Sequence, residues 1–408
     1  MGQGDPCRQH QGGVIPAGFD NVPICEPEWR VQQRIGSVIH AYEEQGFHRT
    51  GTDVDRMSGD WLANEERQIG LEPTLEEFSL SRVDPVGASL VVNDRRIEGL
   101  PFFDGAFTSP TGISGPIGHL NSDASIGLTE IPPNASQTGA LGDARRQNRH
   151  QAIVVITRGA RPGFCPSNAE SFLRPFGPAV LQVASEEAPF LADCARQSAK
   201  AVLTAHVERT QAQAFNVIAV VPGTSKSAAP LVVMTPRSGW WSCTSERGGG
   251  LACWLEIMRA TRATKPVRDV LFVASSGHEL GHVGLDAVIE RRPGLLPAAR
   301  AWIHLGANIG AAQGPANNLQ ASDDEMESMM AEVMTNAGLP IDRRLPRGAV
   351  PRGEAENVHR GGGRYMSIIG NNDLFHNTND RGANAVDLKV IERFASAFAM
   401  VATSLAGA

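Results

Sequence analysis

A short apolar run that ends in a polar turn constrains this chain more than any other stretch. Val270–Ala274 is rich in β-branched and aromatic side chains and has the length of one buried parallel strand. The pattern breaks at Ser275–Gly277, and His278 and Glu279 follow at once. Chemistry in open α/β sheets collects just beyond the carboxyl ends of strands. A His-Glu pair in this place therefore predicts a functional site.

The letters HELGH, from His278 to His282, allow a second interpretation of the same stretch. They satisfy HExxH, in which two histidines one helical turn apart bind zinc and the glutamate acts as base. That pattern needs a helix already running at His278, whereas a strand is expected to end directly before it. Gly277 and Gly281 also weaken a helix. We therefore expect strand, turn and then Glu279, with His282 left as a further candidate ligand.

Short apolar runs alternate with helical patterns through the second half of the chain. Residues 251–258 carry large apolar side chains at i, i+3, i+4 and i+7, and similar spacing from Leu388 to Leu405 predicts a C-terminal helix. Alternating strands and helices predict an α/β fold whose mostly parallel, twisted sheet is sandwiched by helices. The strands expected here are 216–223, 231–236, 270–274, 301–306 and 366–370.

The first part of the chain predicts helices followed by strands. Helical spacing covers Glu28–Gln45, and a second helix is expected to end at Gly70. Two strand-like pieces come next, and Asp84-Pro85 predicts a turn between them. Residues 1–26, rich in Gly, Pro and Gln, predict a loop or tail.

Composition and charge exclude several classes of function. The 408 residues carry a net charge of −7, which gives no reason to expect nucleic acid or an anionic membrane as partner. No signal peptide and no run of transmembrane length is recognisable. The six cysteines lack paired spacing, which favours reduced thiols and a cytoplasmic location. The oligomeric state is left open, a homo-oligomer included.

Several motifs together resemble one known family. The phrase RTGT…WL…GLE spans Arg49–Glu72, and FHNTND spans Phe375–Asp380. The turn at Glu279 is similar to a GEExGxxGS element, and VVITRG at Val154–Gly159 is similar to a signature of protease-associated (PA) domains. With NVIAVVPG at 216–223, these pieces resemble the di-zinc aminopeptidases of metallopeptidase family 28, which includes the glutaminyl cyclases.

The resemblance implies a zinc aminopeptidase-like fold with an inserted, β-rich PA-like domain. Residues 1–108 would form the first part of the catalytic α/β domain. Residues 109–213 would form the insert, and residues 214–408 the remainder of the catalytic domain.

The resemblance also implies five metal-ligand positions, of which three keep a donor. These are Glu246, Glu279 and His376, whereas the positions at 236–238 and at Gly306 have lost theirs. Both lost ligands belong to the same metal, so we expect a degenerate site with one ion. Zinc fits two carboxylates and one histidine, and manganese or iron would be accepted too. Alternatively, Glu246 pairs with the adjacent Arg247.

Other residues at matched or neighbouring positions complete the predicted site. His278 replaces the family's general base and, with an unperturbed pKa of about 6.5, would move protons or act as a ligand. His304 would share the side of the lost ligand at Gly306 and would refill that space or bind metal. Asp380 would stabilise the His376 loop. The remaining candidates for substrate binding are Trp240, Trp241, His359 and Tyr365.

The function that follows is a single-metal hydrolase of an amide or peptide-like acyl bond, acting on a small molecule or short peptide. His278 and Glu279 would be its catalytic residues. One alternative keeps the metal but changes the reaction to cyclase, lyase or hydratase chemistry. A third interpretation is a non-catalytic binding protein on a decayed peptidase fold.

Overall fold

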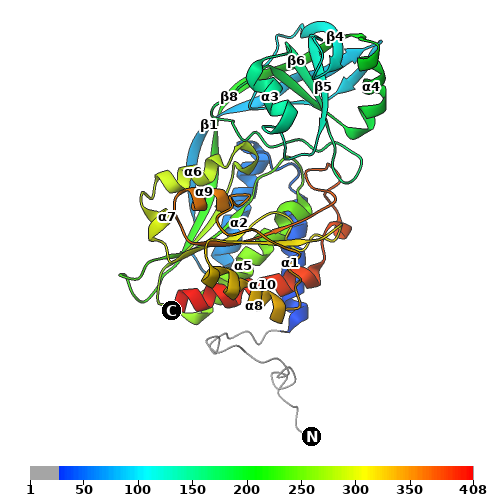
Figure 1. Ribbon diagram of the computed structural model, residues 1–408. Helices are drawn as coiled ribbons and strands as arrows, with labels where there is room; N and C mark the ends of the chain where they lie inside the picture. The colour runs from blue at the N-terminus through cyan, green and yellow to red at the C-terminus, as the bar shows by residue number, and fades with distance from the viewer. Residues whose placement is uncertain (1–26, 408) are drawn as a thin grey trace.

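A long antiparallel ribbon of two strands runs through both lobes of the molecule (Figure 1). In the computed structural model, which describes residues 27–407, β1 (Thr74–Val92) and β8 (Lys200–Val221) pair antiparallel over almost their whole length. The expected turn at Asp84-Pro85 is wrong, because β1 continues through it with a shift of register between Pro85 and Gly87. Such a bulge admits a proline without ending the strand. The loop or tail expected at 1–26 lies outside the described residues.

The larger lobe is built on a mixed sheet with a parallel centre. Its strand order is β13-β12-β14-β11-β9-β10-β8, and β10, β9, β11 and β14 run parallel to one another. β8 is antiparallel to β10, and β12 is antiparallel to β14 but parallel to β13. The bounds are Leu231–Pro236 for β9, Val270–Ser275 for β10, Ala301–Leu305 for β11, Asn317–Ala321 for β12, Arg343–Arg344 for β13 and Tyr365–Gly370 for β14.

Helices cover both faces of this sheet, as the alternating pattern predicted. Successive strand residues point to opposite sides, so Val233 packs in one apolar core and Met234 in another. The first core is closed by five helices and the second by three (Figure 1). The first set is α1 (Glu28–Glu43), α2 (Asp53–Ile69), α5 (Gly249–Thr264), α8 (Asp324–Asn336) and α10 (Leu388–Gly407); the second is α6 (Val283–Glu290), α7 (Leu295–Ala298) and α9 (Ala355–Arg360).

The two ends of α2 and the apolar composition of α10 can be explained from the sequence. The Thr52 hydroxyl accepts the Asp55 N–H at the start of α2, and Gly70 ends that helix in the left-handed conformation, as expected. α10 is long and apolar enough to cross a membrane by length and composition alone. It packs instead against α5 and α8, so its apolar side chains belong to the core.

The smaller lobe has its own sheet and its own apolar cores (Figure 1). Strands β4, β5, β6 and β7 lie side by side in parallel. β4 also pairs antiparallel with β8, which connects this sheet to the long ribbon. Arg145 and Asp104 form a buried ion pair of 2.8 Å beneath it. The elements are β2 (Arg95–Glu98), β3 (Leu100–Pro101), β4 (Ile113–His119), β5 (Ile126–Ile131), α3 (Gly139–Gln147), β6 (Ala152–Thr157), β7 (Ala179–Val183) and α4 (Ala188–Arg196), with β2 extending the long ribbon at β1.

Candidate functional site

The turn after β10 has the predicted strand-turn form. A single 3-10 turn covers His278–Leu280, and α6 begins only at Val283. Gly277, Gly281 and His282 all adopt left-handed backbone angles, with φ of 86°, 74° and 65°. No α-helix therefore contains His278, and the zinc-helix interpretation of HELGH is wrong. The turn nevertheless brings the rings of His278 and His282 together, with centroids 5.1 Å apart.

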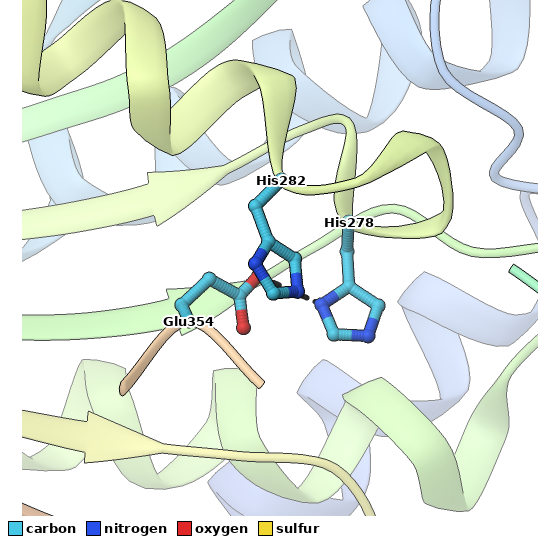
Figure 2. A group of neighbouring side chains, drawn as sticks. All are labelled: His278, His282 and Glu354. Carbon is cyan, nitrogen blue, oxygen red and sulfur yellow. Dashed lines mark hydrogen bonds and ion pairs between the residues drawn. The ribbon is translucent and has the colours of Figure 1, made fainter. Parts of the chain in front are cut away.

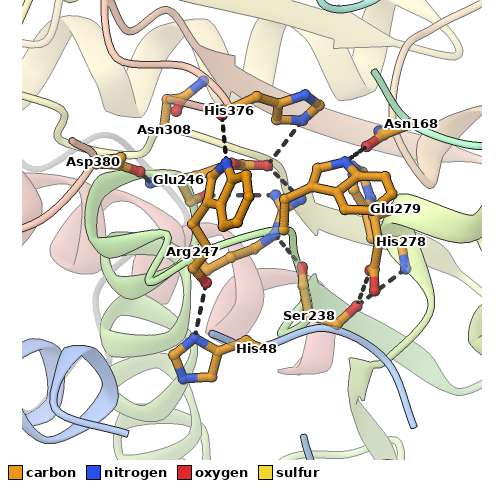
Figure 3. Close-up of polar contacts among 12 residues, drawn as sticks. His48, Asn168, Ser238, Glu246, Arg247, His278, Glu279, Asn308, His376 and Asp380 are labelled. Atoms are coloured by element: carbon orange, nitrogen blue, oxygen red, sulfur yellow. Dashed lines mark hydrogen bonds and ion pairs between the residues drawn. The ribbon is translucent and has the colours of Figure 1, made fainter. Parts of the chain in front are cut away.

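Glu279 is buried, and both of its carboxylate oxygens accept hydrogen bonds. Oε1 accepts the Thr50 backbone N–H at 2.7 Å. Oε2 accepts the Ser238 hydroxyl at 2.7 Å (Figure 3). Burial raises the pKa of this carboxyl against the effect of these donors. The predicted metal ligand thus links the RTGT segment to the end of β9, with both oxygens already in use.

Glu246 and His376 come together across 130 residues of sequence, as the resemblance implied. Glu246 Oε1 lies 3.4 Å from His376 Nε2 and 2.7 Å from Arg247 Nη2 (Figure 3). Although burial alone would raise it, Arg247 and His376 hold the pKa of Glu246 well below its usual range. His376 Nδ1 donates to the Pro166 carbonyl at 2.6 Å, which leaves Nε2 directed at Glu246.

The Glu246 segment is a π-helical turn, Thr244–Gly248, ahead of α5. Such turns occur often at functional sites. Asp380 holds it by accepting the backbone N–H groups of Ser245 and Glu246, each at 3.0 Å. Burial raises the pKa of Asp380 to about 6 in spite of these donors. Asp380 therefore positions Glu246, whereas the sequence had placed its effect on the His376 loop.

A second group of donors surrounds Glu354, a residue that sequence reasoning missed. Glu354 Oε1 lies 2.8 Å from His278 Nδ1, and its Oε2 lies 3.2 Å from His304 Nε2. His282 is turned toward the same carboxylate (Figure 2). Burial would raise the pKa of Glu354, but the histidines hold it well below the usual value. Burial and Arg247 lower the pKa of His278 to about 4, so its ring is neutral at pH 7.

The space beside Gly306 is occupied by Ile369 and His304. A Cβ added at Gly306 would lie 3.2 Å from His304 Cε1 and 2.5 Å from Ile369 Cγ1. His304 Nδ1 bonds Ser367 Oγ at 2.8 Å, so both ring nitrogens are engaged in the interior. His304 thus supports Glu354 and has no exposed face for a substrate.

A buried cation lies at 236–238, where the resemblance placed the other lost ligand. Arg237 pairs with Asp55 at 2.9 Å and also donates to the Phe215 carbonyl at 2.5 Å. The pair is sealed from solvent on both sides. Position 237 therefore carries a buried positive charge.

A loop of the smaller lobe covers the site. Trp240 Nε1 donates to Asn168 Oδ1 at 3.0 Å, and the Ala169 N–H donates to the Glu279 carbonyl at 2.8 Å. Trp241 Nε1 donates to the His376 carbonyl at 2.9 Å, and its ring is half-buried (Figure 3). The two tryptophans thus lie at the site, as predicted.

His359 and Tyr365 are not part of this cluster. Tyr365 is the first residue of β14 and packs in the core, one strand length from the carboxyl end at which the site lies. The His359 ring contacts the Tyr365 ring at 6.1 Å. The structure therefore places both at the opposite edge of the sheet.

The fold defined by this sheet and its flanking helices is that of the zinc aminopeptidases and M28 peptidases, over about 92% of the chain. The chain is similar to the zinc aminopeptidase BSAP from Bacillus subtilis, with 15% identity, a TM-score of 0.74, and 92% of this chain and 94% of that chain covered. It is also similar to a Peptidase M28 precursor from Shewanella amazonensis SB2B, with 15% identity, a TM-score of 0.72, and coverage of 93% and 96%.

A third similar structure is an aminopeptidase from Aneurinibacillus sp. strain AM-1, with 13% identity, a TM-score of 0.70, and coverage of 92% and 94%. The sequence matches no protein-family model, and no curated protein matches it significantly. At identities this low, the structural likeness shows the shared fold alone.

The donors at the site fit one metal ion in chemistry. Within residues 27–407, one group of three side chains offers donor atoms that all lie within 4.8 Å of one another, namely His278, His282 and Glu354. Glu246 and His376 offer a further oxygen and nitrogen that have no hydrogen-bond partner, although Arg247 is ion-paired with the same carboxylate. Imidazole and carboxylate together suit zinc.

Proposed function

We propose that this protein is a metal-dependent hydrolase that cleaves an amide or peptide-like acyl bond in a small molecule or short peptide. It uses one divalent ion, which we propose to be zinc. One observation carries the proposal: buried imidazole and carboxylate donors gather at the carboxyl ends of the central strands, on a fold shared with zinc aminopeptidases. Ligands and chemistry collect at this edge of α/β sheets.

A bound ion would polarise the scissile carbonyl and lower the pKa of a water molecule. As the base, His376 Nε2 would accept a proton from the attacking water, with the ring held by the bond from Nδ1 to the Pro166 carbonyl. The water oxygen would bond to the acyl carbon as its proton moves to the imidazole, and the C–N bond would break as the same proton passes to the leaving nitrogen. The Glu246 carboxylate, 3.4 Å away, stabilises the imidazolium in between.

Arg247 supplies a fixed positive charge beside this pair. Its Nε donates to the Ser238 carbonyl at 2.7 Å, which anchors the guanidinium, while Nη2 has no hydrogen-bond partner beyond its ion pair with Glu246. A buried, preorganised cation stabilises the negative charge that develops on a carbonyl oxygen during acyl transfer. Trp240 and Trp241 give the site apolar walls for the substrate.

The test is hydrolysis of a panel of aminoacyl p-nitroanilides, dipeptides and N-acyl amino acids. At least one member should be cleaved by zinc-loaded protein, and cleavage should be lost on chelation and restored by zinc. His376→Gln should slow turnover by roughly 10² or more, the usual effect of a lost general base. Equal rates for chelated and zinc-loaded protein, or no cleavage of any panel member, would contradict the proposal.

A further inference from the structure

The structure assigns the metal ion to His278, His282 and Glu354. The sequence had placed it first at Glu246, Glu279 and His376, with the two histidines as further possible ligands and Glu354 not considered. This inference rests on the proposed function and deepens it, because it names the residues that hold the ion. The ligand set would be two imidazoles and one carboxylate, with water completing the coordination. That set is one that zinc accepts in catalytic sites.

The three donors converge on one point. The His278 Nδ1 and Glu354 Oε1 atoms lie 2.8 Å apart, and the His282 ring is directed at the space beside them (Figure 2). Ligand atoms around one zinc, at bond lengths of about 2.0–2.2 Å, are roughly 3–4 Å from one another. Since the donor atoms here lie within 4.8 Å, small side-chain rotations would bring all three to bonding distance. All three residues are buried.

Hydrogen bonds place the ring proton of His282 on Nδ1, which leaves Nε2 for the metal ion. Asn357 Nδ2 donates to Asp286 Oδ1 at 2.7 Å, which turns the Asn357 Oδ1 toward His282 Nδ1 at 2.8 Å. An amide oxygen only accepts, so Nδ1 carries the proton and Nε2 keeps its lone pair. Metal-binding imidazoles usually donate their other ring N–H to an oxygen acceptor, as His282 does here to the Asn357 amide oxygen.

Glu354 is oriented in the same manner. Gln320 Nε2 donates to Ser367 Oγ at 3.2 Å, and Ser367 in turn bonds His304 Nδ1 at 2.8 Å. His304 Nε2 then donates to Glu354 Oε2 at 3.2 Å. One carboxylate oxygen is thereby anchored, and Oε1 is left to face the two other donors.

The sequence-predicted positions are less suited to a cation. Glu279 already accepts hydrogen bonds on both oxygens, from Thr50 and Ser238. Glu246 Oε1 is paired with the Arg247 guanidinium at 2.7 Å, and a divalent ion placed there would be repelled by that fixed charge. Arg247 thus takes the electrostatic role of an ion at Glu246.

Zinc binding to the full chain, measured by elemental analysis and calorimetric titration with Zn²⁺, tests the assignment. Wild type should bind one ion per chain. His282→Asn should weaken binding at least 100-fold, and asparagine tolerates the left-handed backbone at 282, so strain cannot explain the loss. Glu354→Gln should weaken binding similarly, and Asn357→Leu by 10- to 100-fold. His359→Ala, on the same helix as Asn357, is the matched control and should bind as wild type does.

Zinc X-ray absorption of the loaded wild type gives an independent readout. The assigned ligands predict two imidazoles, whereas Glu246, Glu279 and His376 predict one. One imidazole, or loss of zinc in His376→Ala with retention in His282→Asn, would overturn the assignment and leave the proposed function standing. Failure of wild type to bind zinc would also overturn it. Two imidazoles without hydrolysis of any panel substrate would support the assignment and contradict the proposed function alone.

Discussion

At the scale of single residues, the buried ring of His48 should make the stability of the fold depend on pH. This ring stacks on Tyr42 with centroids 3.7 Å apart, and burial lowers its pKa to about 3. The unfolded chain, with a histidine pKa of about 6.5, binds more protons between these values, so stability is present above pH 6.5 and falls as the pH decreases. Between pH 7 and pH 5, His48 should lower the unfolding free energy of the wild type by about 2 kcal/mol. The His48→Phe variant should lack this contribution.

Urea unfolding of wild type and His48→Phe at both pH values gives this difference. The phenylalanine keeps a flat ring against Tyr42, so packing is closely matched. The same pH dependence in both proteins would show that His48 titrates as it does in the unfolded chain.

Sequence reasoning reached some site residues and missed others for identifiable reasons. Glu246 and His376 stand in recognisable motifs, and the structure brings them together. Glu354 and Asn357 belong to no motif, and only their i, i+3 spacing at the start of a short helix offered a signal. Arg247 was considered only as a partner for Glu246, which it is, and its burial could not be read from the letters.

At the scale of elements, the turn after β10 depends on Gly277. Its φ is +86°, and a Cβ there would lie 2.5 Å from Val283 Cγ2. Gly294 has the same φ of +86° but nothing within 4 Å of the added atom. Gly294→Ala should therefore cost about 1–2 kcal/mol of stability from backbone strain alone. Gly277→Ala should cost about 1–3 kcal/mol more, because the methyl group must also displace a packed side chain.

Urea midpoints of the two alanine variants and wild type measure both costs. Equal destabilisation by the two substitutions would mean that the turn relaxes away from Val283. In that case the contact with Val283 adds nothing to the cost of Gly277→Ala, and the positive φ alone explains the lost stability.

Elements with a strong local pattern were predicted well, and those decided by long-range pairing were not. The strand at Val270–Ala274 is confirmed because five apolar residues end in a clear break. β1 was divided in two because Asp84-Pro85 favours a turn locally. Pairing with β8 over the full length outweighs that preference, and a bulge accommodates the proline.

At the scale of the whole molecule, the two lobes meet over the site. Four hydrogen bonds join the 162–170 loop to the larger lobe, at Trp240, Glu279, His376 and Asn377. These partners lie from about 70 to more than 200 residues away in sequence, so no local pattern could have predicted that the smaller lobe covers the donors. The larger lobe therefore supplies the donors of the site, and the 162–170 loop of the smaller lobe covers them.

The last prediction tests the attachment of this loop to the larger lobe. Asn168→Ala removes the acceptor of the Trp240 N–H and leaves that indole donor without its 3.0 Å bond. It should cost about 1–3 kcal/mol of local stability, the usual effect of a buried donor left unpaired. Amide hydrogen exchange should then rise in peptides covering 162–170 and in those covering 277–282, which the loop contacts through Ala169. Gln147→Ala, at an exposed end of α3, is the control and should change neither region. Faster exchange confined to 162–170 would show that the turn after β10 holds its shape without the smaller lobe.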